Sequence, residues 1–485
     1  MDRITMILII LSGWVMLPVQ EGIAQEHRPT QEEIIRSLIE EIPPLEHPRG
    51  ERIPMRGSRL ENWLPENDQE ARQVLKALDA RGIGMSYRVR PFDEENLAAA
   101  VRMGRLQQEL ELPVSVHASS ALYGFFNGDE NTFHVDEDGN PFFDDSFGSR
   151  KMGCPFRLEH RKDDIKDQVR SVMDAYDEAG ITVDFIYFDW EIDGPIEWNE
   201  AWEHSKQCVV CREHVPDLTV NFYSFQDSLR KIRSELQREC AVDVITEYYP
   251  DALTGNYAVY PHNGVRYWYD YFEVLPDGAP YIADQNAKYR SWYPEFEEAG
   301  YTFANPTVYT WYPTWSWYPG FDNDDYRWFY NMLLVASNAG RHTPKEIPLI
   351  TWVHWHTTVP PEDGGVAPQM SEWAYQELLS HMFLRGTESL MMWCRPEETV
   401  KEVRLMQEVY DTVGQWWEFI SEGTPLLFKV PQSPGSVISA VQYDNKLLVR
   451  RTDFTDVADP VEFEIEGQKV SIPRRDGQFQ VIKLP

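Results

Sequence analysis

The chain is poor in cysteine and carries far fewer cationic than anionic side chains. Among 485 residues there are 5 cysteines, 45 Lys or Arg and 79 Asp or Glu, so the formal net charge is −34. A surface this acidic repels phosphate backbones, and we expect no nucleic-acid partner. Apolar residues make up 42% and charged residues 26%, a globular composition that excludes a largely disordered chain.

Several motifs are also missing. No glycine-rich phosphate turn follows a strand-like segment, which disfavours a doubly wound dinucleotide-binding sheet and points to no cofactor. No G-x-S-x-G motif is present, so the nucleophile elbow of an α/β-hydrolase is not expected. Beyond the N-terminus no stretch is long and apolar enough to cross a bilayer.

The N-terminus has the pattern of a secretory signal peptide. Arg3 precedes a mostly apolar run over residues 4–19, and the small residues Gly22 and Ala24 form a cleavage site. The other interpretation is a membrane anchor, which Pro18 and the short run disfavour. We therefore expect cleavage after Ala24, a secreted or periplasmic protein, and no membrane span in the mature chain.

From residue 67 to 423, helix-like and strand-like patterns alternate. Repeated βα units predict a parallel sheet, and seven or eight of them over this length predict a (β/α)8 TIM-like barrel. A doubly wound open sheet is the alternative. Seven strand candidates span residues 83–89, 112–117, 181–188, 242–249, 301–309, 348–355 and 389–393. An eighth strand is expected near residues 52–55.

Two flanking regions have different compositions. Residues 25–66 are polar and proline-rich, which predicts an N-terminal arm wrapped on the body. Residues 424–485 contain short apolar runs separated by Asp, Asn, Pro and Gly, which predicts a small antiparallel all-β domain. Within the barrel, residues 119–160 form a long loop, and such loops are usually functional.

The most informative segment is the apolar strand predicted over residues 181–188. It is followed by Asp189, Glu191 and Asp193, which would point to one side at steps of about 6.6 Å. The active site of a barrel lies at this end of its strands. Crowded acids raise one another's pKa, so one carboxyl group can stay protonated. This protonated group can serve as a general acid, and Asp193 would shape the electrostatic field around it. Solvated loop acids or a divalent-cation site are the alternatives.

The same segment resembles the D-x-x-D-x-D-x-E signature of family 18 chitinases and related endo-N-acetylglucosaminidases. Asp184, Asp189 and Glu191 match three of its acids, and Tyr187 replaces the middle Asp, where its hydroxyl could bond Asp189. The resemblance implies that Glu191 is the general acid and that Asp189 orients the substrate's own N-acetyl group as nucleophile. The strand ending at Trp393 resembles the one whose Trp floors the chitinase sugar site.

A substrate without an N-acetyl group would need a second carboxylate as nucleophile or base. Glu247, at the end of the strand predicted over 242–249, and Asp284 are the candidates. The strand over 349–356 ends without an acid, which favours the substrate-assisted mechanism.

Aromatic and histidine side chains crowd the predicted strand ends. The sequence has 17 Trp, 24 Tyr and 23 Phe, and flat rings bury the apolar faces of sugars. Histidines there would bond sugar hydroxyls, although His117, His354 and His356 could also bind a metal. The predicted substrate-binding residues are Tyr187, Trp190, His117, Glu247, Tyr248, Tyr309, Trp311, Trp352, His354, Trp355, His356 and Trp393.

Residues 204–214 contain the pattern His-x3-Cys-x2-Cys-x2-His, which has the composition of a zinc site. A disulfide between Cys208 and Cys211, or one that involves Cys154 or Cys240, is the alternative for an exported chain. Either way we expect a structural role, and the odd number of cysteines leaves one thiol unpaired.

Together these patterns predict a secreted glycoside hydrolase acting on a poly- or oligosaccharide, with Glu191, Asp189 and Asp193 as catalytic residues and no metal. Two alternatives remain: a non-catalytic glycan-binding protein on a barrel scaffold, and a metal-dependent carbohydrate hydrolase or deacetylase.

Overall fold

A computed structural model describes residues 28–122, 128–146, 150–191, 201–267, 290–311, 315, 321–358, 367–465 and 467–484. The predicted signal peptide, Asp193 and Asp284 lie outside the described residues. Among the described helices, none combines the length and the apolar composition that a bilayer span requires.

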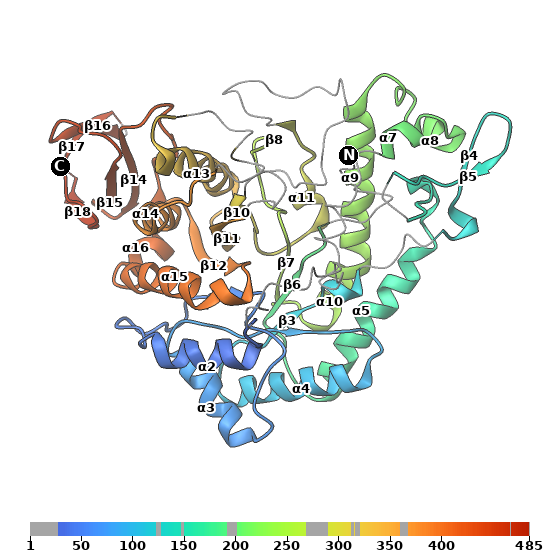
Figure 1. Cartoon of the computed structure of the whole chain (residues 1–485), viewed down its shortest axis with the longest axis horizontal. Coiled ribbons are helices and arrows are strands. Elements are labelled where there is room, and N and C mark those ends of the chain that lie inside the picture. Colours follow the sequence, from blue (N-terminus) through green and yellow to red (C-terminus); the bar gives the residue numbers. More distant parts are fainter. Residues whose placement is uncertain are drawn as a thin grey trace, which may run out of the picture.

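Eight parallel strands form the centre of the molecule (Figure 1). One sheet has the order β2-β3-β6-β7 and the other β1-β12-β11-β10. The strands are β1 (Arg56–Gly57), β2 (Tyr87–Arg88), β3 (Ser115–His117), β6 (Phe185–Phe188), β7 (Leu253–Asn256), β10 (Thr307–Trp311), β11 (Leu349–Thr358) and β12 (Thr387–Met392).

Hydrogen bonds connect the two sheets at both of their edges. Parallel bridges pair Met55 with Ile83 and Glu61 with Ser86, next to β1 and β2. On the other side the Thr302 amide donates to the Thr254 carbonyl of β7 at 2.9 Å. The predicted mixed α/β fold with parallel strands is confirmed, and the (β/α)8 barrel remains a prediction that these bridges favour.

Side chains from both sheets meet in the space between them. The Arg56 guanidinium lies 3.9 Å from the centroid of the Phe185 ring and donates to Ser115 Oγ at 2.9 Å. Phe185 stacks in turn on Phe303, with 4.9 Å between ring centroids. Burial lowers the pKa of Arg56 to about 9. The strands therefore enclose a packed interior.

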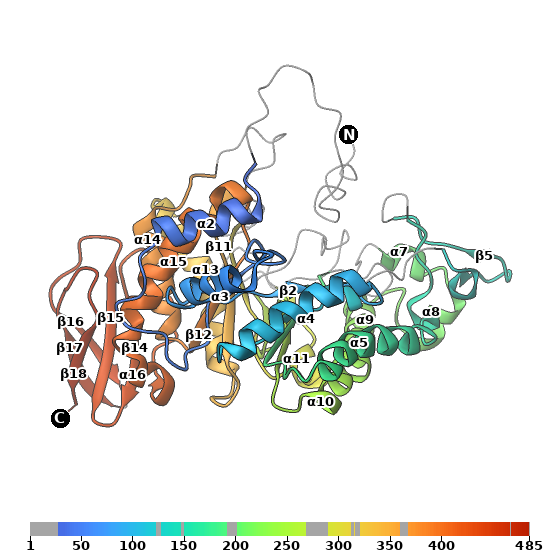
Figure 2. The ribbon, with the colours of Figure 1, turned by 90° about the horizontal axis from the view of Figure 1, so that it is seen from below.

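Helices follow the strands and surround them (Figure 2). Side-chain caps start several of them: Asp93 accepts from the Asn96 amide and Ser371 from the Ala374 amide. The sequence predicts both caps, because each residue directly precedes a helix-like segment. The helices are α3 (Asp68–Asp79), α4 (Glu94–Glu109), α5 (Arg161–Glu178), α9 (Phe222–Gln237), the π-helix η5 (Arg238–Val242), α10 (Asp243–Tyr248), α11 (Glu295–Ala299), α13 (Asp324–His342), α14 (Glu372–Phe383), η8 (Pro396–Glu398), α15 (Thr399–Gly414) and α16 (Trp417–Glu422).

Two predicted elements differ from the structure. The strand over 242–249 is wrong, because these residues continue the helical run of α9 through η5 and α10, and the strand is β7. The sequence also predicts a helix over residues 322–339 that Gly340 ends, but α13 continues to His342. A Cβ at Gly340 would lie 1.7 Å from the Arg385 carbonyl oxygen, so the glycine permits a close backbone approach.

The arm over residues 25–66 is more structured than its composition suggests. Thr30 and Glu33 form a capping box at the start of α2 (Gln31–Glu41). Further along, the arm contributes β1 to a parallel sheet. It also supplies Glu61, whose side chain is buried beside the ends of β3 and β6.

The loop over residues 119–160 contains short elements that pack against the segment after residue 200. Its elements are η1 (Ser119–Ala121), η2 (Glu130–Thr132), β4 (His134–Val135), β5 (Pro141–Phe142) and η3 (Pro155–Arg157). Phe142 of β5 and Phe156 of η3 pack against a second, small core that includes residues of α7 (Trp202–Ser205), α8 (Val209–His214) and α9. Strands β8 (Val265–Arg266) and β9 (Arg290–Ser291) form a separate antiparallel pair.

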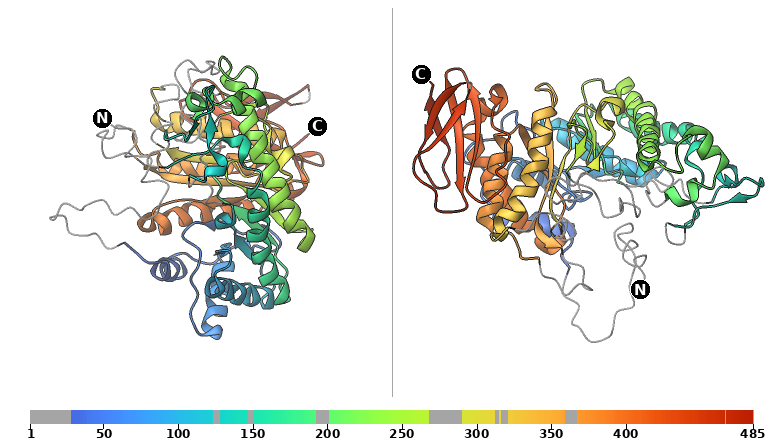
Figure 3. Two further views of the ribbon diagram at one scale, coloured as in Figure 1. Left: turned by 90° about the vertical axis from the view of Figure 1, so that its right-hand side faces the viewer. Right: turned by 90° about the horizontal axis from the view of Figure 1, so that it is seen from above.

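The C-terminal region is antiparallel, as predicted. Its strands are β13 (Thr424–Pro425), β14 (Ser436–Tyr443), β15 (Lys446–Asp453), β16 (Val461–Ile465), β17 (Gln468–Ile472) and β18 (Gln480–Lys483). An ion pair between Arg450 and Glu377 of α14, 2.6 Å apart and buried, joins this region to the helices. Figure 3 shows it at the end of the molecule opposite β4 and β5.

Candidate active site

Polar groups from three segments meet at the carboxyl ends of the parallel strands. The Nδ1 of His117, at the end of β3, donates to Glu61 Oε1 at 2.8 Å. Its Nε2 lies within hydrogen-bond distance, 2.5 Å, of the Ser119 hydroxyl oxygen. Ser119 Oγ in turn accepts from the backbone amide of Asp189 at 2.5 Å. This polar chain, Glu61–His117–Ser119–Asp189, holds the segment that leaves β6.

Tyr187 reinforces the polar chain from β6. Its hydroxyl donates to Glu61, and its ring stacks on His117 with 4.3 Å between centroids and an interplanar angle of 20°. The three side chains are between 2% and 3% exposed. The tyrosine in place of the signature's middle Asp therefore bonds Glu61, where we expected a bond to Asp189.

The two carboxyl groups of the polar chain have different environments. Burial raises the pKa of Asp189, and the charge of Glu61 raises it further, while His117 and Arg88 oppose the rise. Burial would also raise the pKa of Glu61, but the charge and hydrogen bond of His117 and the Tyr187 hydroxyl hold it below its usual value. Neighbouring acids with divergent pKa values are typical of acid–base catalysis.

The order Ser–His–Glu is also that of a hydrolase triad, so the accessibility of Ser119 matters. Its side chain is fully buried, with 0% exposure. Its oxygen also accepts a hydrogen bond from the Asp189 backbone amide. A nucleophile must reach the substrate, so Ser119 is a positioning residue for Asp189 rather than a nucleophile.

The backbone of Trp190, the next residue after Asp189, is held in the core by two hydrogen bonds. Its amide donates to Asn256 Oδ1 at 2.9 Å, and its carbonyl accepts from Arg233 Nη2 at 2.5 Å. Its side chain is 0% exposed, so the prediction that Trp190 contacts substrate is wrong. Glu191 follows immediately and is half-buried, which leaves it within reach of solvent.

A continuous series of rings lies beside the polar chain, and we call it the aromatic floor. Tyr187 contacts Trp352 at 6.2 Å between centroids, and Trp352 contacts Tyr257 at 6.3 Å. Tyr257 contacts Tyr309 at 6.4 Å, which stacks on Trp393 at 6.2 Å. The structure thus brings together four predicted substrate-binding residues, and Trp393 is partly exposed.

The histidines of β11 have separate roles. His354 is fully buried and donates from Nδ1 to the Trp393 carbonyl at 2.6 Å, and burial lowers its pKa to about 3. His356 lies 3.4 Å from Glu402 of α15. The Trp355 indole donates to the Met370 carbonyl at 2.8 Å on the helix side, so its predicted place in the sugar site is wrong.

These histidines and His117 do not assemble a metal site. Two groups of potential metal ligands occur among the described residues, and neither contains His117, His354 or His356. His117 is instead bonded on both ring nitrogens.

Other predicted site residues lie elsewhere. Glu247 and Tyr248 are on α10, which precedes β7 and so lies toward its amino end, and the Tyr248 hydroxyl donates to Asp174 at 2.7 Å. Their predicted role at the strand ends is wrong. Asp184 accepts from the Val114 amide at 2.8 Å at the amino end of β6. Trp311 ends β10, and its side chain lies outside the described residues.

The cavity with a volume of about 710 Å³ lies away from this site. It is lined by α13 and the C-terminal β region, including Asn338, Arg341, Phe428 and Ile438. It contains no member of the polar chain or the aromatic floor, so we do not assign the chemistry to it.

No protein-family model and no curated protein matches the chain. Among solved structures it is similar to α-L-fucosidase isoenzyme 2 from Paenibacillus thiaminolyticus, with 13% identity and a TM-score of 0.42 over 75% of this chain and 50% of that one. It is also similar to a polyextremophilic β-galactosidase from the Antarctic haloarchaeon Halorubrum lacusprofundi, with 13% identity and a TM-score of 0.44 over 76% and 59% of the two chains.

A third similar structure is the α-amylase from Geobacillus thermoleovorans, with 10% identity and a TM-score of 0.43 over 89% and 96% of the two chains. The present chain spans 50% and 59% of the length of the first two proteins. These TM-scores are below 0.5, so the likeness assigns no activity to this chain. The resemblance to the family 18 signature is likewise matched by no family model.

Proposed function

We propose that this protein is a glycoside hydrolase whose active site lies at the carboxyl ends of β1, β3, β6 and β10–β12. The observation that carries the proposal is Asp189, whose backbone amide is held by the polar chain beside the aromatic floor and whose carboxyl group has a raised pKa. Glycosidic cleavage needs paired carboxyl groups in different environments, and sugar rings pack on aromatic faces.

In this mechanism Glu191 donates a proton to the oxygen that bridges two sugars. Asp189 orients and polarises the reacting group, which for an N-acetylhexosamine is the substrate's own N-acetyl group acting as nucleophile. Asp193 shapes the field of the acid. The polar chain fixes the backbone at Asp189, and Asn256 fixes it at Trp190, so both bonds position the segment that carries Asp189 and Glu191.

The signal-like N-terminus supports a further proposal, that the protein acts outside the cytoplasm on a poly- or oligosaccharide. Such a substrate would reach the half-buried Glu191 from solvent and lie along the floor toward Trp393.

The test is release of reducing ends from a panel of polysaccharides, N-acetylated and not, by the full chain and two variants. Glu191→Gln should lower kcat by roughly 10²–10⁴-fold because it removes the proton donor, while binding of the glycan is retained. Glu247→Gln is the matched control, since that exposed glutamate lies on α10. Full turnover by Glu191→Gln would overturn the assignment, and binding without cleavage by any form would indicate a glycan-binding protein.

A further inference from the structure

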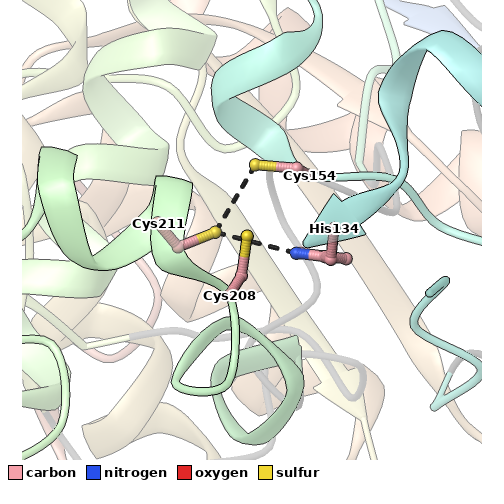
Figure 4. Close-up of side chains that lie close together, drawn as sticks. All are labelled: His134, Cys154, Cys208 and Cys211. Atoms are coloured by element: carbon pink, nitrogen blue, oxygen red, sulfur yellow. Dashed lines mark hydrogen bonds between the residues drawn. The ribbon is translucent and has the colours of Figure 1, made fainter. Parts of the chain in front are cut away.

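Four side chains converge in the small core at the end of the molecule opposite the C-terminal region. They are His134 of β4, Cys154 before η3, and Cys208 and Cys211 at the start of α8. Figure 4 shows the three sulfurs and the imidazole nitrogen pointing toward one another. One ligand atom from each lies within 4.8 Å of all the others, and each side chain is at most 1% exposed.

This group differs from the one that the pattern over residues 204–214 predicts. His204 pairs instead with Asp144, with 3.0 Å between Nδ1 and Oδ1. His214 is exposed, and its Nδ1 donates to the Val210 carbonyl at 2.9 Å. Both histidines of the sequence pattern are therefore engaged elsewhere, and two ligands come from the loop over 119–160.

The cysteines of the group are thiols rather than disulfides. All five cysteines of the chain are free. Cys240 lies in the main core and Cys394 bonds Thr399, so neither takes part in the group. The alternative expected from the sequence, a disulfide between Cys208 and Cys211 or one that involves Cys154 or Cys240, is not formed.

The distances fit a tetrahedral metal site. Zinc–sulfur bonds of about 2.3 Å place two ligand sulfurs roughly 3.8 Å apart at the corners of a tetrahedron. The sulfurs of Cys154 and Cys211 are 3.5 Å apart, and Cys211 Sγ is 3.7 Å from His134 Nδ1. Three sulfurs and one imidazole nitrogen are a ligand set that zinc prefers in structural sites.

We propose that His134, Cys154, Cys208 and Cys211 bind a structural Zn²⁺ ion. The four protein ligands fill a tetrahedral shell and leave no position for a substrate, which separates this site from catalysis. The ion joins the loop over 119–160 to the segment that follows residue 200. The proposal is independent of the proposed glycosidase activity.

The local structure explains why this region needs a cross-link. Helix α8 has 6 residues, and β4 and η3 have 2 and 3, lengths that are not stable alone. The small core that they share contains side chains such as Met152, Trp202 and Phe222 but is separate from the main core. Small cores of this kind commonly rely on a metal or disulfide.

The direct test is the zinc content of the full chain, purified without chelators under reducing conditions. We expect about one zinc per chain in the wild type. Cys211→Ser should lose most of it, because the other ligands cannot complete the shell. Cys240→Ser is the matched control, since it removes an equally buried thiol outside the group and should keep the zinc.

A second measurement does not depend on the folding of a variant. Replacement of the ion by Co²⁺ in the wild type should give the intense visible bands of a tetrahedral site and a sulfur-to-cobalt charge-transfer band in the near ultraviolet. Removal of the ion by a chelator should speed proteolysis within residues 128–222 relative to the rest of the chain.

Three outcomes would overturn the proposal. They are zinc far below stoichiometric amounts after loading, an octahedral cobalt spectrum, and a mapped disulfide among Cys154, Cys208 and Cys211 in the native protein. A Glu191→Gln variant should keep its zinc, so failure of the glycosidase proposal leaves the zinc result unchanged.

Discussion

Substitution of Ser119 by Ala tests whether the polar chain positions Asp189 or forms a nucleophilic triad. The change removes one oxygen that lies 2.5 Å from His117 Nε2 and accepts the Asp189 amide, also at 2.5 Å. It leaves the Glu61–His117 pair and the aromatic floor in place. The two mechanisms predict losses of very different size.

The expected loss follows from one lost hydrogen bond. A buried donor left without its partner costs about 1–3 kcal/mol. If this cost falls wholly on the transition state, kcat drops by roughly 5–150-fold, since about 1.36 kcal/mol corresponds to tenfold. KM should change little, because the change leaves the aromatic floor in place. A catalytic nucleophile, in contrast, is worth about 10⁶-fold in kcat.

The assay compares kcat and KM of Ser119→Ala with those of Ser228→Ala on a glycan that the wild type cleaves. Ser228 donates to the Ser224 carbonyl within α9, so its variant controls for loss of a serine hydroxyl. Circular dichroism shows whether each variant is folded. A loss above about 10⁵-fold in folded Ser119→Ala, or labelling of Ser119 by a fluorophosphonate, would refute the positioning role.

Three further predictions concern single side chains. Tyr187→Phe keeps the stack on His117 but removes the hydroxyl bond to Glu61, so the free energy of unfolding measured by urea titration should fall by about 1.5–3 kcal/mol; an unchanged midpoint would contradict this. Trp393→Ala should raise KM by roughly tenfold with kcat retained, as expected for loss of a stacking surface, and an unchanged KM would exclude it from the sugar site. Burial raises the pKa of Glu388 to about 7, so its ionised form destabilises the fold, and stability should fall as pH rises from the unfolded pKa of about 4.5 through 7. Glu388→Gln should therefore increase the unfolding free energy at pH 8 by up to about 3 kcal/mol and much less at pH 4, and an equal effect at both pH values would contradict the raised pKa.

Local features of the sequence determined much of the secondary structure. The caps Asp93 and Ser371 mark helix starts correctly, because capping depends on side chains within a few residues of the helix end. The apolar run before Asp189 predicts β6, since a strand buried on both faces is continuously apolar. The alternation of such segments predicts parallel strands for the same reason.

Prediction of secondary structure from local sequence failed where tertiary packing outweighed the intrinsic propensity of the residues. Residues 242–248 are rich in β-branched side chains and suggest a strand, yet Ala241, Val244 and Ile245 bury one face of a helix. This error placed Glu247 at the strand ends, while the acid that lies there, Glu61, came from the polar, proline-rich arm over residues 25–66, which the sequence did not place at the site.

Tertiary structure alone decided which polar groups became partners. Glu61 bonds Tyr187 across 126 positions of the chain, and Cys211 meets Cys154 across 57 and His134 across 77. Periodicity records which side chains are buried, because burial repeats with the pitch of a helix or strand. It carries no information about which distant segments adjoin, since that depends on how the strands are ordered and on the need of each buried polar group for a partner.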